Sequence, residues 1–143
     1  MKLPELECTA GFYIGIALAI LLLPWEVLAA FLVASGFHEF CHIVALRCCH
    51  VPIRQIKLSA FGAKIETAAM IPEQELVCAA VGPIASLLLV FLAHWFPILA
   101  IFGLCQGLFN LLPIYPMDGG RVVRSIFLLA KMSRCGYNSP DHT

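Results

Sequence analysis

The sequence contains very little charge. Only 13% of its 143 residues are Asp, Glu, Lys or Arg, and nine acidic and nine basic residues give a formal net charge of zero. The chain therefore lacks the basic balance that indicates nucleic-acid binding, and no nucleic-acid partner is predicted. By contrast, 61% of the residues are hydrophobic and the mean hydropathy is +0.91, whereas soluble domains are roughly 45–50% apolar. The composition indicates a membrane protein whose main partner is the lipid bilayer.

The cysteines do not form a disulfide framework. Their number, seven, is odd, and Cys41, Cys78 and Cys105 lie inside apolar runs. Because free cysteine is among the most buried residue types, we interpret the cysteines as packing residues. The adjacent Cys48 and Cys49 could contact a metal, but packing is the preferred interpretation for them too.

A cleavable signal peptide is not expected. The first apolar run follows the acidic residues Glu5 and Glu7, and Pro24-Trp25-Glu26 stands where a small-residue cleavage site would lie. A second apolar run begins immediately afterwards. We therefore expect the first run to be a membrane span.

Long apolar runs predict four transmembrane helices in an all-α membrane domain that extends over residues 1–143. A helix needs about 20 residues to cross the bilayer, so there is room for little else. The predicted spans are residues 9–23, 27–49, 74–93 and 97–112.

Two segments outside these spans have their own patterns. Apolar and polar residues alternate on both sides of Phe61-Gly62, which predicts a short interfacial β-hairpin over residues 54–67. Prolines and glycines between residues 113 and 120 predict an interruption of regular helix. An interfacial helix with a basic stripe is then expected over residues 121–132.

All nine basic residues fall on one side of the four-span arrangement. They precede the first span, follow the second or follow the fourth: Lys2, Arg47, Arg54, Lys57, Lys64, Arg121, Arg124, Lys131 and Arg134. Cytoplasmic segments of membrane proteins are enriched in Lys and Arg. We therefore predict a multi-pass protein of the cell membrane with both termini in the cytoplasm.

His38, Glu39 and His42 form a His-Glu-x-x-His motif inside the second predicted span. Histidines four residues apart lie on one helical face and can bind one ion, and the glutamate lies beside the open coordination position. An ionisable group at this depth costs about 2.5–3.5 kcal/mol, so three in five residues require a compensating role. The alternative is a polar patch that hydrogen-bonds helices together. The spacing favours a metal site.

Asp118 is the expected third ligand, because a catalytic zinc ion usually has three protein ligands. Of the charged residues, Asp118 is the one whose carboxylate the chain can bring to the membrane depth of the two histidines. Counted along the helices, that depth is ~20 Å from the outer membrane face. Asp118 follows Asn110, Pro113 and Pro116, which turn a helix into extended chain. Irregular backbone at this depth is tolerated where it is buried in protein or lines a water-filled cavity.

Together, these motifs resemble the site-2 protease family of intramembrane zinc metalloproteases. The resemblance rests on His38-Glu39-x-x-His42, Gly82-Pro83 and Asn110-x-x-Pro113-x-x-Pro116-x-Asp118-Gly119. The compact core and the Phe61-Gly62 hairpin resemble the sporulation-type branch, which cleaves a membrane-associated transcription-factor precursor.

The resemblance implies one Zn²⁺ ion per chain, bound by His38, His42 and Asp118, with Glu39 as the catalytic base. The expected substrate is a transmembrane or membrane-associated protein that is cleaved near the cytoplasmic side. Asn110 either orients the substrate and the oxyanion or bonds the carbonyls freed at the helix break. The pattern is also compatible with a homo-oligomer or a regulatory membrane partner. The competing function is zinc binding without proteolysis, by an inert relative, a sensor or a transporter.

Overall fold

The computed structural model describes residues 5–59, 62–115 and 117–137. Helices dominate these residues, and three short strands form one small sheet. In chain order the elements are β1 (Glu5–Cys8), α1 (Ala10–Leu22), α2 (Trp25–Cys48), β2 (Ile53–Ser59), β3 (Gly62–Thr67), α3 (Pro72–Leu88), the 3-10 helix η1 (Leu89–Leu92), α4 (Pro97–Asn110) and α5 (Asp118–Tyr137).

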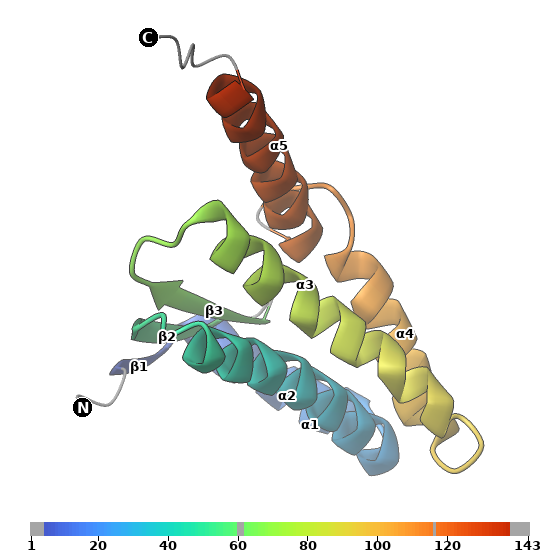
Figure 1. Ribbon diagram of the computed structural model, residues 1–143. Helices are drawn as coiled ribbons and strands as arrows, with labels where there is room; N and C mark the ends of the chain where they lie inside the picture. The colour runs from blue at the N-terminus through green and yellow to red at the C-terminus, as the bar shows by residue number, and fades with distance from the viewer. Residues whose placement is uncertain (1–4, 60–61, 116, 138–143) are drawn as a thin grey trace, which may run out of the picture.

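α3 is the central helix. It packs against α2, α4 and α5, and η1 continues it towards α4. Figure 1 shows α1 alongside α2, the sheet at one end of these helices, and α5 projecting away from the bundle. This arrangement brings α2, α3 and the start of α5 together, although they are far apart in the sequence.

The apolar helices lie where the sequence predicts them. With η1 counted as the end of α3, each helix end is within two residues of the predicted bounds. Two segments, Trp25–Cys48 and Pro72–Leu92, are long and apolar enough to cross a membrane. α1 and α4 are apolar but shorter. The four-span arrangement therefore stays a prediction.

The helix after the proline and glycine segment differs from its prediction. α5 has 20 residues and begins at Asp118, whereas the sequence predicts residues 121–132. A Cβ at Gly119 would collide with the backbone carbonyl of Leu111, and one at Gly120 would lie 2.7 Å from the carbonyl carbon of Ile114. Glycine weakens a helix by ~1 kcal/mol, but here it allows the first turn of α5 to touch the preceding backbone.

The predicted hairpin is present in a mostly helical fold, and the sheet contains one strand more than the sequence predicts. β2 and β3 are antiparallel, and β1, which the sequence analysis missed, pairs in parallel with β2. Lys57 on β2 lies 3.4 Å from Glu66 and 3.5 Å from Glu7, and these two carboxylates raise the pKa of Lys57, Glu66 more strongly. β1 has only four residues, too few to show a recognisable period-2 pattern.

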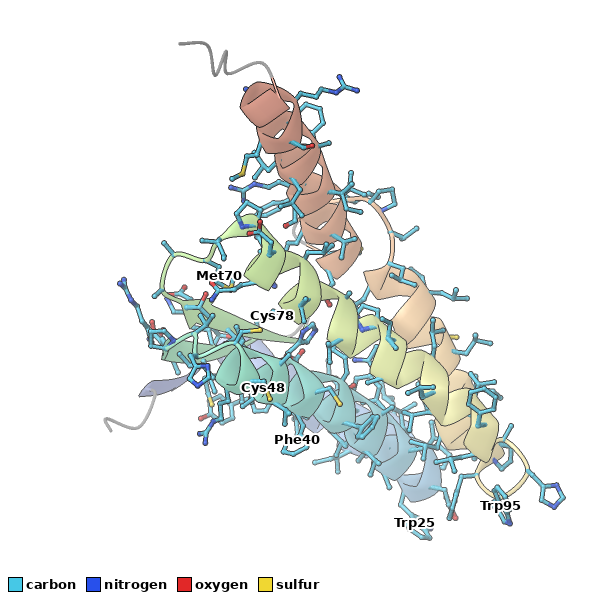
Figure 2. All side chains as sticks on the ribbon, viewed as in Figure 1. Trp25, Phe40, Cys48, Met70, Cys78 and Trp95 are labelled. Atoms are coloured by element: carbon cyan, nitrogen blue, oxygen red, sulfur yellow. The ribbon has the colours of Figure 1, made fainter. Side chains whose placement is uncertain are left out.

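Large apolar side chains cover the outer faces of the helices. Leu21 and Phe91 are each 79% exposed, an arrangement suited to lipid. Trp25 and Trp95 are 75% and 68% exposed and lie at the end of the helices away from the sheet (Figure 2). Tryptophan is enriched at membrane–water interfaces. The two side chains mark a candidate outer boundary of the apolar region.

Candidate metal centre

α2 presents two buried histidines on one face. His38 is 2% exposed and His42 is 7% exposed, and their Nε2 atoms lie 3.1 Å apart. The residues belong to successive turns of an uninterrupted helix. Their convergence follows from their spacing, since residues i and i+4 lie one above the other on a helix.

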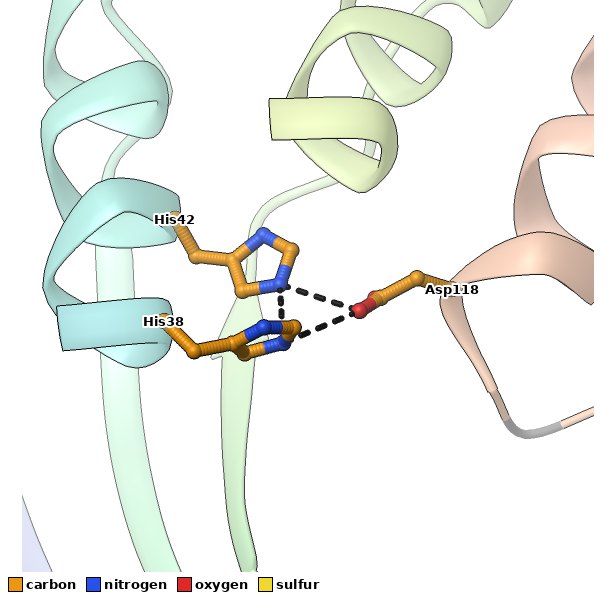
Figure 3. A group of neighbouring side chains, drawn as sticks. All are labelled: His38, His42 and Asp118. Carbon is orange, nitrogen blue, oxygen red and sulfur yellow. Dashed lines mark hydrogen bonds and ion pairs between the residues drawn. The ribbon is translucent and has the colours of Figure 1, made fainter. Parts of the chain in front are cut away.

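Asp118 approaches the histidines from α5. Its Oδ2 atom lies 3.0 Å from Nε2 of His42 and 3.3 Å from Nε2 of His38. Figure 3 shows the carboxylate pointing into the space between the two imidazoles. The structure thus brings together the three residues that the sequence predicts as ligands.

α3 fixes the orientation of both imidazoles. Nδ1 of His42 donates to the backbone carbonyl of Cys78 at 2.7 Å, and Nδ1 of His38 lies 2.8 Å from the Ser86 hydroxyl oxygen. A proton on Nδ1 leaves a lone pair on Nε2, the atom that faces the carboxylate. Sequence reasoning missed Ser86. The signal available in the sequence was a single serine inside an apolar run.

Gly82 on α3 provides the space that the His42 imidazole occupies. A Cβ at this position would lie 2.7 Å from Cδ2 of His42 and closer still to Nε2. Any other residue at position 82 would therefore displace the ring. Gly82 of the Gly82-Pro83 pair thus has a steric role at the site.

The geometry of this group suits a cation. Two Nε2 atoms and a carboxylate oxygen converge at separations of 3.0–3.3 Å. With both histidines protonated on Nδ1, all three atoms present lone pairs to the space between them, where a cation would bind. A tetrahedral zinc ion with bonds of ~2.1 Å separates its ligands by ~3.4 Å, so a small outward shift accommodates it. Two histidines and a carboxylate also match a catalytic zinc site, which leaves a fourth position open. The residues present therefore fit zinc.

The other predicted site residues lie nearby in the chain but outside this group. Glu39 follows His38 on α2 and is partly buried, and Asn110 is the last residue of α4. In the part of the chain that the structure describes, Asn110 makes no side-chain hydrogen bond to the three candidate ligands. Cys48 and Cys49 lie at the C-terminal end of α2, outside the metal-binding group.

A charged network lies on the other side of Asp118. Its Oδ1 atom is 3.7 Å from Nη1 of Arg121, whose Nε atom is 3.6 Å from Oε1 of Glu75. Arg124 approaches the same Glu75 oxygen at 4.0 Å. Sequence reasoning missed this network. The structure places Glu75 in the first turn of α3, facing α5.

The comparisons with known proteins agree with this geometry. No family model matches the sequence. The chain is 32% identical over 117 residues to a zinc metalloprotease from Methanocaldococcus jannaschii; the match covers 71% of this chain and 34% of that protein. The chain thus spans about a third of the length of this relative. It also resembles the solved structure of a site-2 protease from Methanocaldococcus jannaschii, with a TM-score of 0.67 and 28% identity over 89% of this chain and 69% of that one.

Proposed function

Because this chain belongs to the site-2 protease family, we propose that it is a zinc-dependent intramembrane endopeptidase. The observation that carries the proposal is the convergence of His38, His42 and Asp118, with Glu39 one residue from His38. The proposed substrate is a transmembrane or membrane-associated protein.

The reaction requires a Lewis acid and a base. Zinc, when bound by His38, His42 and Asp118, lowers the pKa of water and polarises the scissile carbonyl. Glu39 takes a proton from the attacking water and passes it to the leaving amine as the peptide bond breaks. Neighbouring residues on a helix are rotated by about 100° from each other. Glu39 therefore points to the side of the helical face that carries His38 and His42.

Asn110 is a candidate for binding the substrate carbonyl. Its side chain is partly exposed at the end of α4, so it is accessible to a ligand. An amide that donates to a developing oxyanion is worth ~3 kcal/mol. Bonding the carbonyls at the helix break is the equal alternative for this residue.

A membrane location is supported by the two long apolar helices, by the outward-facing apolar side chains and by the family. His38 lies thirteen residues after Trp25, or ~20 Å along α2. With Trp25 at the outer boundary, the centre lies nearer the cytoplasm, and both termini are cytoplasmic. Cleavage is therefore proposed near the cytoplasmic side.

The sheet offers a place for an extended substrate. The strand order is β1-β2-β3. β2 is therefore the central strand, and β1 and β3 form the two edges of the sheet. An unwound substrate segment can add to such an edge through backbone hydrogen bonds. This binding mode and the sporulation-type substrate remain part of the proposal.

The test uses the purified chain in detergent with a single-span membrane substrate. Zinc content and cleavage are measured in the same preparation for the parent and for Asp118→Ala. Bound zinc and metal-dependent cleavage in the parent, both lost in the variant, support the proposal. Full zinc occupancy in Asp118→Ala contradicts the ligand assignment and redirects attention to Cys48, Cys49 or His50. Zinc binding without cleavage of any tested substrate favours the alternative, a zinc-binding membrane protein without proteolytic activity.

A further inference from the structure

The two carboxylate oxygens of Asp118 have different neighbours. Oδ2 faces the histidines at 3.0 and 3.3 Å, whereas Oδ1 faces the guanidinium of Arg121 at 3.7 Å. Arg121 lies three residues after Asp118 on α5, and residues at this spacing are neighbours on a helix surface. The positive charge of Arg121 therefore favours a rotamer that leaves Oδ2 free for a metal.

Glu75 holds Arg121 from the opposite helix. Its carboxylate lies 3.6 Å from Nε of Arg121, so the guanidinium lies between Glu75 of α3 and Asp118 of α5. The side chains of Arg121, Glu75 and Asp118 are 28%, 15% and 12% exposed. Ion pairs with this degree of burial are screened less than surface pairs. The negative charge of Glu75 also offsets the positive charge of Arg121. This limits repulsion between the guanidinium and a bound cation.

Residues of α3 therefore interact with all three candidate ligands, with two of them directly and with the third through Arg121. Ser86 bonds His38, the Cys78 carbonyl bonds His42, and Glu75 reaches Asp118 through Arg121. Groups that bond a metal ligand from outside fix its orientation, and their loss typically costs 10–100-fold in metal affinity.

We propose that Arg121 is a positioning residue for Asp118, anchored by Glu75, and that it holds the carboxylate in its metal-binding orientation. This inference rests on the proposed zinc site. It concerns the chain before any substrate binds, so it can be tested without an activity measurement.

The experiment measures zinc affinity by competition with a chromophoric chelator, on purified folded chain in detergent. Arg121→Gln is expected to weaken zinc binding by ~10–100-fold, and Glu75→Gln by a smaller factor. Arg121→Lys keeps the positive charge and should restore most of the affinity. Arg124→Gln is the matched control, because Arg124 approaches the same Glu75 oxygen but is 62% exposed and is not paired with Asp118. It should bind zinc like the parent.

A double-mutant cycle separates positioning from a general packing role. If Arg121 acts through the carboxylate, Arg121→Gln should have little further effect on zinc affinity in an Asp118→Asn background. The same loss in that background overturns the inference. Unchanged or tighter zinc binding by Arg121→Gln also overturns it, and leaves the zinc site in place. A folded parent chain that binds no zinc overturns the zinc site and this inference together.

Discussion

The buried side chains of His38 and Ser86, 48 positions apart in the sequence, are joined by a hydrogen bond of 2.8 Å between Nδ1 and Oγ. Ser86 is fully buried, so few other partners are available to it. The bond connects α2 to α3 and leaves the Nε2 atom of His38 facing the Asp118 carboxylate.

Replacing this serine tests whether orientation matters for metal binding. Ser86→Ala should lower zinc affinity by ~10–100-fold, because His38 loses the hydrogen-bond partner that holds the orientation of its ring. Zinc competition measures the effect. Ser133→Ala, an exposed position on α5, is the control, and a Ser86→Ala affinity equal to that of the parent would contradict the role.

Gly82→Ala should damage the site more severely. The added Cβ would occupy the position of the His42 ring, so the ring must move away from His38 and Asp118. We expect loss of stoichiometric zinc with the helical circular-dichroism signal retained. Gly36→Ala is a suitable control, because a Cβ there meets nothing within 4 Å. Normal zinc binding by Gly82→Ala would show that the ring has another position from which to bind the metal.

Glu39→Gln separates a protease from a zinc-binding protein. The amide keeps the shape of the side chain but cannot accept a proton, so zinc should stay bound while cleavage falls by ~10²–10⁴-fold. Both quantities are measured on one preparation. Unimpaired cleavage would refute Glu39 as the base.

Ser125 allows a prediction about stability. Its Oγ atom is fully buried on α5 and has no hydrogen-bond partner among the described residues. An unsatisfied buried hydroxyl costs about 1–3 kcal/mol, so Ser125→Ala should raise the free energy of unfolding by about 1 kcal/mol. Denaturant titration in detergent measures this difference, with Ser133→Ala as the exposed control. Destabilisation by Ser125→Ala would indicate that the hydroxyl is bonded in the folded protein.

Topology can be tested by cysteine labelling on a cysteine-free background. A cysteine at Lys57 or Arg134 should be protected from an impermeant reagent applied outside, because the basic residues mark the cytoplasmic side. A cysteine at Trp95, at the opposite end of the helices (Figure 2), should react. External labelling at Lys57 or Arg134 would refute cytoplasmic termini.

The local parts of the fold could be predicted from the sequence. Uninterrupted apolar runs specify helices, since a backbone in lipid must satisfy its own hydrogen bonds. The spacing of His38 and His42 alone puts them on one helical face. Alternation of apolar and polar residues on either side of Phe61-Gly62 predicted the hairpin, although residues 60–61 lie outside those that the structure describes.

The tertiary structure decided which distant groups meet. β1 forms by pairing with β2, which lies more than 40 residues later in the chain, and the early start of α5 depends on contact between Gly119 and the backbone of Leu111. Ser86, the Cys78 carbonyl and Gly82 orient the histidines because α3 packs against α2, and Arg121 meets Glu75 because α3 also packs against α5. Local residue patterns specify helices and the faces they present, whereas side-chain orientation within the centre depends on how those helices pack.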